Sequence, residues 1–556
     1  MASKKKSFSN EIMGYALKNA IEYGKADAGK IMPKLFNHGL EKDMIKEIMP
    51  EIISKVTEVN KISEEGKEIA FENYKEYIKI NEDCSKKLTP LKNPSKHMVF
   101  RLAPYPSGAM HIGNAKTYLL NAIYAEHYKG KILFVMDDTI GSEEKHLVPE
   151  GYKLLEECVR LLGVKYKKPI IYKSDRLKIY YKYAVELIKK DKAYVCHCSA
   201  EKIRENRANG IECGCRKFPQ GIHLARWKEM FKMSDGEAVL RLKTSMTHPN
   251  PAFRDRVLFK ISTRKHPRKK NKYKVWPSLE MSWAIDDHLL GITHIIRGND
   301  LMMETEVEKF IWDIFKWKHP EVNHVALVRL SGVGAKISKS KAQKEVKSGE
   351  FMGWDDPRTW SIQSLIRRGI TKEAIRDFVE EIGLNNQDII VPIDNLYAAN
   401  RKRIDAKAER YSFVKEPMML LFDKPYKIKE VEVPIHPDTP NKTRKIKLPQ
   451  IIIDGDDFQN YKGKEVRLIH LFNIKIENKE KTRVTSVENK KIPKIQWVSD
   501  EVPCRVLMPD GKWVLGMAES GIKRLKKGQI IQFERFGFVR FDTKAKDAYE
   551  FWFAHR

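Results

Sequence analysis

Two short segments of the chain carry residue types suited to binding phosphate groups. The first is Arg101-Leu-Ala-Pro-Tyr-Pro-Ser-Gly-Ala-Met-His-Ile-Gly-Asn114, which follows a strand-like run at 97–103 and precedes a helical apolar pattern at 113–128. Small residues let the backbone approach a phosphate closely, and the start of a helix favours negative charge. This segment therefore predicts a nucleotide phosphate site at the carboxyl edge of a parallel sheet.

The second segment is Lys336-Ile-Ser-Lys-Ser340, which follows Ser331-Gly-Val-Gly334. Two lysines and two hydroxyl groups on such a loop can neutralise a triphosphate, and a flexible cation can follow the charge that develops on a leaving pyrophosphate. Either segment alone is weak, because a basic loop is more often a solvated surface. Their presence in one chain carries much more weight than either segment alone.

The elements around these segments indicate several domains. A strand, a glycine turn, a helix and a second strand at Lys131–Met136 form a βαβ unit, which implies a parallel sheet. Residues 8–80 have helical apolar spacing, and residues 83–96 have the composition of a linker. Runs of β-branched and aromatic residues after about 416 predict one or two barrels; these runs are Val466–Ile476, Lys494–Val498, Val502–Met508, Trp513–Met517 and Ile530–Phe541.

Four of the seven cysteines form two closely spaced arms, Cys196-His-Cys198 and Cys213-Gly-Cys215. Four thiolates are a closed ligand set for structural zinc, and His197 could replace one of them. The alternative is a set of four reduced free cysteines. The odd number of cysteines argues against a disulfide framework and favours a reducing compartment.

Charge and hydropathy restrict the partners and the location. The formal net charge is +30, which favours a phosphate-rich partner such as RNA, although generally lysine-rich surfaces are the alternative. No apolar run approaches the roughly 20 residues of a membrane span. The start, Met-Ala-Ser-Lys-Lys-Lys, has no apolar stretch after it. We therefore expect a cytoplasmic protein with no membrane partner.

Together, the two phosphate segments resemble the paired signatures of class I aminoacyl-tRNA synthetases. Longer motifs resemble the glutamyl/glutaminyl branch of that class. They are Asp137-Asp-Thr139, Pro249-Asn-Pro-Ala-Phe-Arg-Asp255, Asp286-Asp-His-Leu-Leu-Gly-Ile-Thr-His294 and Phe533-Glu-Arg-Phe-Gly-Phe538. The helical N-terminal region and the β-rich C-terminal region resemble the archaeal type of glutamyl-tRNA synthetase, because the bacterial glutamyl enzymes end in helices.

The resemblance implies an α/β fold with a Rossmann-like class I catalytic domain. It also implies a helical N-terminal domain and a C-terminal β-barrel anticodon-binding region. The expected boundaries are 1–96 for the helical domain and linker, 97–194 and 276–345 for the two halves of the catalytic domain, 195–275 for an acceptor-stem-binding insertion with the cysteines, 346–415 for a helical connecting domain, and 416–556 for the barrels.

The resemblance also implies a two-step reaction that uses ATP with Mg2+. Glutamate is activated to glutamyl-adenylate with release of pyrophosphate, and the glutamyl group is then transferred to tRNA. His111, Asn114, Lys336 and Lys339 would be catalytic. The ATP site would comprise Pro104, Ser107, Gly108, His111, Gly113, Asn114, Lys336, Ser338, Lys339 and Ser340. A related zinc knuckle supports structural zinc at Cys196, Cys198, Cys213 and Cys215.

Glutamate carries two carboxylates and one ammonium group, so its pocket needs two cations and one acid. By resemblance these are Arg101, Arg297 and Asp137, and a guanidinium group pairs well with a carboxylate. Two positions depart from the family. Asn114 replaces a second histidine and cannot become cationic, and Leu279 replaces a common pocket tyrosine.

These departures keep alternative functions open. A glutaminyl-tRNA synthetase is disfavoured by Arg297, since that branch commonly has a small neutral residue there. A tRNA-binding paralogue without charging activity is disfavoured by retention of Lys336 and Lys339. A nucleotidyltransferase with the same sheet would leave the β-rich C-terminal region unexplained. The expected partners are tRNA(Glu), ATP and L-glutamate, with tRNA(Gln) left open, and we expect a monomer.

Overall fold

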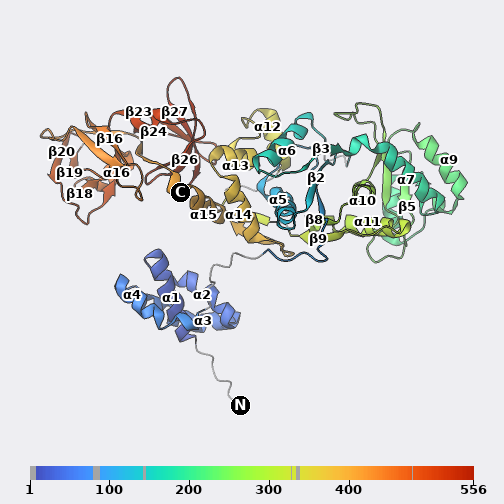
Figure 1. The fold of residues 1–556 in the computed structure, drawn as a ribbon, viewed down its shortest axis with the longest axis horizontal. Helices are drawn as coiled ribbons and strands as arrows, with labels where there is room; N and C mark the ends of the chain where they lie inside the picture. The colour runs from blue at the N-terminus through green and yellow to red at the C-terminus, as the bar shows by residue number, and fades with distance from the viewer. Residues whose placement is uncertain (1–7, 79–87, 142–145, 327, 334–338, 479) are drawn as a thin grey trace, which may run out of the picture. The chain divides into compact units, whose positions relative to one another are not determined.

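The computed structural model describes residues 8–78, 88–141, 146–326, 328–333, 339–478 and 480–556, and it divides into two compact units (Figure 1). The first unit comprises residues 1–87 and the second comprises residues 88–556. No helix among the described residues is both long enough and apolar enough to cross a bilayer.

The first unit is a helical module with a core of its own. Its α-helices are α1 (Ser9–Tyr23), α2 (Ala28–Leu35), α3 (Ile45–Val59) and α4 (Glu64–Glu72). Ile12 and Ala16, one helical turn apart on α1, are fully buried with Ile52 of α3. The side chain of Ser63 caps α4 by accepting a hydrogen bond from the backbone nitrogen of Gly66. The predicted helical N-terminal region is therefore confirmed.

A parallel sheet forms the centre of the second unit. β1 (Val99–Leu102), β2 (Lys131–Met136) and β3 (Lys167–Tyr172) pair in parallel, and α5 (Ile112–His127) connects the first two. β8 (His294–Gly298) pairs in parallel with β9 (Glu321–Val325). The backbone nitrogen of Thr293 donates to the carbonyl of Val99 at 3.0 Å, which joins β8 to the edge of β1. The predicted βαβ unit and its parallel sheet are confirmed.

An antiparallel subdomain is inserted between β3 and β8. It contains α7 (Leu177–Lys189), α8 (Ala200–Asn209), α9 (Gln220–Met230) and the sheet β4 (Ala193–Cys196), β5 (Val239–Leu242), β6 (Val257–Ile261) and β7 (Val275–Pro277). The chain returns to the parallel sheet through α10 (Leu279–Leu289), where the side chain of Ser278 caps the helix by accepting from the nitrogen of Met281. α11 (Met302–Phe315) follows β8 and packs against α10. The remaining helix of this region, α6 (Pro149–Leu161), lies between β2 and β3 in the chain.

A group of helices connects the parallel sheet to the C-terminal β-rich region (Figure 1). It consists of α12 (Lys339–Ser348), α13 (Ile362–Arg368), α14 (Lys372–Ile382) and α15 (Ile393–Ile404), with β10 (Val328–Ser331) paired to β11 (Ile389–Pro392). α13 and α14 are separated at Gly369, whose φ is +101°. Arg368 is fully buried and donates to the backbone carbonyls of Phe553 and Ala554, so it fastens these helices to the end of the chain.

The C-terminal region is β-rich, as predicted. A seven-stranded sheet runs in the order β12 (Arg410–Tyr411), β25 (Ile530–Phe533), β26 (Gly537–Lys544), β27 (Tyr549–His555), β23 (Glu501–Leu507), β24 (Trp513–Glu519) and β13 (Phe413–Lys415). Its two edge strands are separated by Ser412 alone, so the sheet nearly closes on itself.

Smaller sheets complete this region. One contains β20 (Lys481–Ser486), β19 (Asn473–Asn478), β18 (Glu465–Leu468) and β21 (Lys494–Ile495). A second contains β14 (Met418–Leu420), β17 (Ile451–Ile453) and β22 (Trp497–Val498), and β15 (Glu430–Pro434) pairs with β16 (Thr443–Lys447). Two predicted strands, 466–476 and 530–541, are each split by a turn at His470 and Arg535, whose φ values are both +63°.

Candidate active site

A pocket of about 790 Å3 opens beside the carboxyl ends of β1 and β8. Five predicted site residues line it, namely Arg101, Gly113, Asn114, Asp137 and Arg297, and the unexpected residue Leu279 lines it as well. Among the described residues, the predicted ATP-site members Pro104, Ser107, Gly108 and His111 lie on the β1–α5 segment but are not part of the pocket lining. Lys336 and Ser338 lie outside the described residues, and so do the side chains of Lys339 and Ser340.

The β1–α5 segment holds its backbone close to its neighbours. The carbonyl of His111 accepts hydrogen bonds from the backbone nitrogens of Asn114 and Ala115, both at 3.0 Å, so His111 occupies the position before the first turn of α5. A Cβ atom on Gly113 would lie 3.2 Å from the His111 ring, and one on Gly108 would lie 2.5 Å from the ring of Trp354. The two glycines therefore allow the close packing that the sequence pattern indicated.

Arg101, on β1, forms a buried ion pair at the floor of the pocket. Its Nε atom is 2.5 Å from Oδ1 of Asp287, and its Nη2 atom is 3.0 Å from Oδ2. The guanidinium carbon also lies 3.5 Å from the ring centroid of Trp283, which is a stacking and cation–π contact. Asp287 and Trp283 both come from α10, so the insertion's return helix positions the arginine.

Asp137, at the end of β2, is paired with a buried lysine. Nζ of Lys173 lies 3.2 Å from Oδ1 of Asp137 and donates to Oγ of Ser282 at 2.7 Å. The same ammonium group lies 3.3 Å from the ring centroid of Trp283. Burial raises the pKa of Asp137 and lowers the pKa of Lys173, because both charged forms lose water, while each partner opposes the shift of the other.

Arg297, on β8, is paired with Glu308 of α11. Its Nη1 atom donates to Oε1 of Glu308 at 2.9 Å, and Nη2 contacts Oε2. The guanidinium side chain is 4% exposed and the carboxylate is fully buried. Each of the three side chains predicted to bind glutamate therefore has an internal partner of opposite charge.

These partners are the residues that sequence reasoning missed. Lys173 is the first residue of the short 3-10 helix η4 (Lys173–Asp175), and nothing in its sequence spacing marked it. Glu308 carried a signal, because it shares one face of α11 with buried Thr305 and Trp312 at spacings of three and four. A charged residue on such an apolar face needs a partner, which here is Arg297.

The wall of the pocket formed by the insertion contains a second charge cluster. Arg256 lies 2.5 Å from Glu280 and 3.1 Å from Glu304. Leu279, at the start of α10, supplies no hydroxyl group, but Tyr105 and Tyr118 also line the pocket. Burial raises the pKa of Tyr105 to about 12, so its hydroxyl stays protonated at neutral pH.

Several side chains of the basic stretch at 264–274 have partners within the protein. His266 is fully buried and donates from Nε2 to the carbonyl of Asp138 at 2.7 Å. Arg268 pairs with Asp175 at 3.0 Å, and Lys269 contacts the same carboxylate. These contacts fasten the insertion to the parallel sheet.

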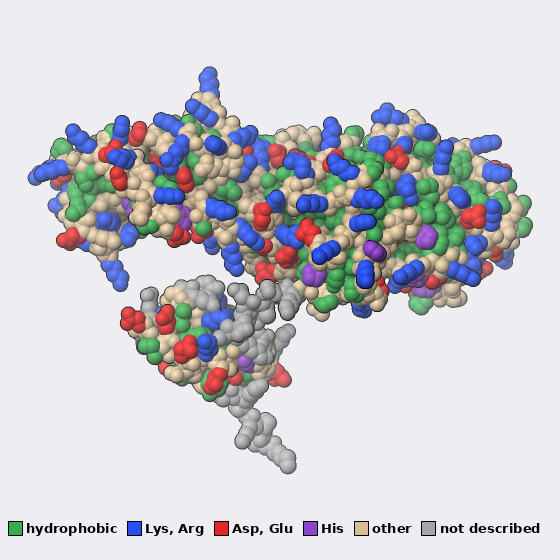
Figure 2. Space-filling model, viewed as in Figure 1, with side chains coloured by type: hydrophobic (Ala, Val, Ile, Leu, Met, Phe, Trp, Pro, Cys, Tyr) green, Lys and Arg blue, Asp and Glu red, His purple; other side chains and the backbone are tan. Residues whose placement is uncertain are grey.

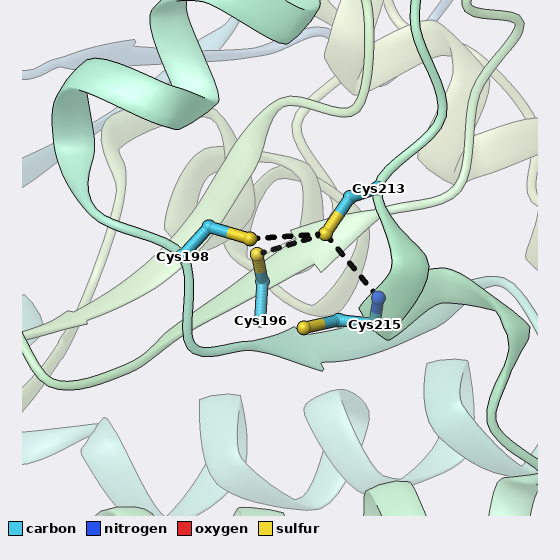
Figure 3. Close-up of side chains that lie close together, drawn as sticks. All are labelled: Cys196, Cys198, Cys213 and Cys215. Atoms are coloured by element: carbon cyan, nitrogen blue, oxygen red, sulfur yellow. Dashed lines mark hydrogen bonds between the residues drawn. The ribbon is translucent and has the colours of Figure 1, made fainter.

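The four clustered cysteines converge within the insertion, where β4 ends at Cys196 (Figure 3). Sγ of Cys213 lies 3.6 Å from Sγ of Cys196 and 3.2 Å from Sγ of Cys198, and all four sulfur atoms lie within 4.8 Å of one another. A tetrahedral zinc ion with Zn–S bonds of about 2.3 Å places sulfurs about 3.8 Å apart, so the cluster fits such an ion. Sequence spacing alone predicted this convergence.

A parallel sheet with a phosphate-type β1–α5 turn, an inserted subdomain and C-terminal barrels defines an α/β enzyme of the class I synthetase type. The family model described as tRNA synthetases class I (E and Q), catalytic domain, matches residues 97–406. Two models for the anticodon-binding domain of the same family match residues 408–492 and 494–542. The chain therefore belongs to the class I tRNA synthetases of the E and Q group.

Similar proteins extend over nearly the whole chain. A glutamate–tRNA ligase of Pyrococcus abyssi is 41% identical over 555 residues, which cover 95% of this chain and 96% of the relative. One from Pyrococcus furiosus is 40% identical and covers 98% of both chains. One from Methanocaldococcus jannaschii is 36% identical, with 98% of this chain and 100% of the relative covered.

Proposed function

We propose that this chain is a glutamate–tRNA ligase that activates L-glutamate with ATP and transfers it to tRNA(Glu). The observation that carries the proposal is the convergence of Arg101, Asp137 and Arg297 in one pocket that Asn114 also lines. Two guanidinium groups and one carboxylate complement the two carboxylates and one ammonium group of glutamate. The curated relatives with this name support the same function over nearly their full length.

In the first step, a carboxylate oxygen of glutamate attacks the α-phosphorus of ATP, and the bond to the bridging oxygen of pyrophosphate breaks. The products are glutamyl-adenylate and pyrophosphate. In the second step, a hydroxyl of the terminal tRNA adenosine attacks the acyl carbon, and AMP leaves with the bonding electrons. The protein's contribution is positioning and charge stabilisation, with no covalent intermediate on a side chain.

The ATP roles are assigned to the two phosphate segments. His111, Asn114, Lys336 and Lys339 would contact the phosphates, and the backbone of the β1–α5 turn would approach them closely. Mg2+ would screen the triphosphate charge when it binds with ATP. Asn114, exposed on the first turn of α5, can donate a hydrogen bond from its amide without changing its charge.

The tRNA would contact the insertion and the barrels. Lysine and arginine side chains are distributed along the visible face of the larger unit (Figure 2), as expected for a partner with a phosphate backbone. Trp497 does not serve as a stacking platform in this arrangement, because it is 2% exposed and its Nε1 donates to the carbonyl of Ile469.

One charging experiment tests the proposal. Purified enzyme is incubated with ATP and with labelled glutamate or glutamine, on tRNA(Glu) and on tRNA(Gln) separately. We expect glutamyl-tRNA(Glu) as the main product. Glutaminyl-tRNA as the main product would identify a glutaminyl enzyme, and tRNA binding without any charging would identify a paralogue that has lost catalysis.

Replacing Arg297 with cysteine is expected to raise the KM for glutamate about tenfold to a hundredfold. That range corresponds to the loss of a hydrogen-bonded charged contact worth roughly 1.5–3 kcal/mol. The KM for ATP should change less than twofold, since Arg297 lines the amino-acid side of the pocket. Both constants are read from ATP–pyrophosphate exchange with tRNA present. An equal loss for ATP would argue against a role in reading glutamate, and the Arg297→Lys variant distinguishes charge from two-point pairing.

The cysteine cluster is proposed to hold one structural zinc ion through Cys196, Cys198, Cys213 and Cys215. Four thiolates leave no open coordination position, so the ion would stabilise the insertion and take no part in the reaction. Elemental analysis of untagged protein, purified without chelators, should give about one zinc per chain. Cys213→Ser should lose the metal and Cys504→Ala, in the C-terminal sheet, should keep it. Less than about half an equivalent in the unaltered protein would contradict the proposal.

A further inference from the structure

The ion pair between Arg297 and Glu308 places a protein carboxylate on the guanidinium group that faces the amino-acid pocket. Both terminal nitrogens of Arg297 are used by Glu308, while its buried Nε has no hydrogen-bond partner among the described residues. A guanidinium group offers five N–H donors in a fixed plane, so Arg297, which lines the pocket, retains a donor that Glu308 does not use. The Nε–H group of Arg297 can therefore donate to an acceptor that the protein itself does not supply.

The charged groups that act on Glu308 come from four other elements of the fold. They are Arg297 on β8, Arg101 on β1, Asp287 on α10 and Lys173 on η4 (Lys173–Asp175), and His324 of β9 lies beside Arg297. Burial is the largest influence on the pair, since it raises the pKa of Glu308 to about 8 and lowers the pKa of Arg297. The attraction between the two ions does not offset their loss of water on burial. The neutral form of Glu308 is therefore accessible near neutral pH.

A second carboxylate cannot join this pair without a change in charge. If glutamate's side chain approached Arg297 while Glu308 stayed ionised, one guanidinium group would face two buried carboxylates. Two carboxylates that share one site cannot both remain ionised at low cost, so one of them takes up a proton. The substrate carboxylate retains its charge most easily if the proton goes to the fully buried Glu308.

We propose that Glu308 is a specificity-determining residue that competes with the substrate's side-chain carboxylate for Arg297 and must be protonated when glutamate binds. The inference rests on the proposed function, in which Arg297 reads that carboxylate. A substrate with a neutral side chain requires no such proton. The preference for a carboxylate side chain therefore weakens as pH rises through the pKa of Glu308.

The Glu308→Gln variant tests the proposal, because glutamine keeps the size of the side chain and cannot ionise. The KM for glutamate is measured for the wild type and for the variant by tRNA-dependent pyrophosphate exchange from pH 6.5 to 9. The wild-type KM is then divided by the variant KM at each pH. The ratio removes any titration of glutamate itself. We expect a ratio near one at pH 6.5 and about ten at pH 9, since affinity falls about tenfold per pH unit above the pKa.

A calorimetric measurement provides a second readout that a purely structural role would not change. Glutamate is titrated into the enzyme–tRNA complex at pH 9 in buffers with different ionisation enthalpies. The wild type should take up about one more proton per glutamate than Glu308→Gln. A flat KM ratio across the pH range, equal proton uptake in the two proteins, or a ratio that falls with pH would each overturn the proposal.

The matched control is Glu306→Gln, which makes the same chemical change on the same helix. Glu306 is exposed and pairs with Lys309 at 3.2 Å, away from the pocket. Its KM ratio to the wild type should stay near one at every pH. If the wild type charges no tRNA with glutamate at any pH, the proposed function fails and this inference fails with it. If the wild type charges glutamate and Glu308→Gln shows the same pH profile, only the inference fails.

Discussion

Replacing Lys339 with alanine is expected to slow glutamyl-adenylate formation about a hundredfold or more. Lys339 belongs to the second phosphate segment and is the first residue of α12, and its ammonium group is assigned to the charge that develops as pyrophosphate leaves. Removing one such preorganised donor typically costs 10²–10³ in rate, and about a hundredfold corresponds to about 2.7 kcal/mol of activation free energy. The loss should appear in kcat, because the contact strengthens in the transition state.

ATP–pyrophosphate exchange with tRNA(Glu) and saturating glutamate measures this rate. Lys341→Ala is the matched control, since Lys341 lies two residues further along α12 with its side chain 63% exposed and 3.5 Å from Glu345. We expect that variant to stay within about twofold of the wild type, because exposed pairs contribute little. Unchanged exchange in Lys339→Ala would remove the second segment from the catalytic machinery.

Local signals predicted the elements of the fold well wherever apolar periodicity and turn residues agreed. β2 occupies the predicted residues Lys131–Met136, and α5 begins within one residue of its predicted start. The errors have a common cause. The runs that were expected to be continuous at 466–476 and 530–541 are interrupted by His470 and Arg535, which adopt the left-handed conformation without being glycine. Such a turn is stabilised by tertiary contacts, and the residue type gives no warning of it.

Motifs also located the pocket, but they did not reveal its electrostatics. Arg101 and Asp137 lie at strand ends near the β1–α5 turn, so topology alone brings them together. Their partners come from distant parts of the chain, and Asp287 is 186 residues from Arg101. An ion pair of that separation depends on how α10 packs over the sheet. A single sequence shows the charges without showing which of them meet.

The ion pairs of the pocket change how Leu279, a departure from the family pattern, is interpreted. Leu279 removes a hydroxyl from one wall of the pocket, yet Tyr105 and Tyr118 supply protonated hydroxyls elsewhere in the lining. The larger difference from the expected site lies in the charges. Lys173 and Glu308 already pair with Asp137 and Arg297, so in the proposed function glutamate binding would exchange one set of charged contacts for another.

Replacing Asp287 with alanine is expected to lower the free energy of unfolding of the catalytic domain by about 3–5 kcal/mol. Asp287 is 1% exposed and holds Arg101 through two hydrogen bonds at the centre of the pocket floor. Removing one member of a buried pair leaves the other charge unsolvated and uncompensated, and costs of that size follow. Arg101 is 6% exposed, so it cannot regain water without displacing its neighbours.

Because the chain has several domains, amide hydrogen exchange of β1 and α10 is the appropriate measurement, supported by tryptophan fluorescence during denaturation. Asp313→Ala is the control on α11, since that carboxylate is 69% exposed and meets only His319 at 2.9 Å among its described ion-pair partners. Its change should stay below about 0.5 kcal/mol. Asp287→Asn should lie between the two, because the amide keeps an acceptor for Arg101 but removes the charge.

If Asp287→Ala lost less than about 1 kcal/mol, another group would have to compensate Arg101. Lys173 and Arg297 are also cations, so that group would have to be Asp137 or Glu308, and the pocket charges would then be interchangeable.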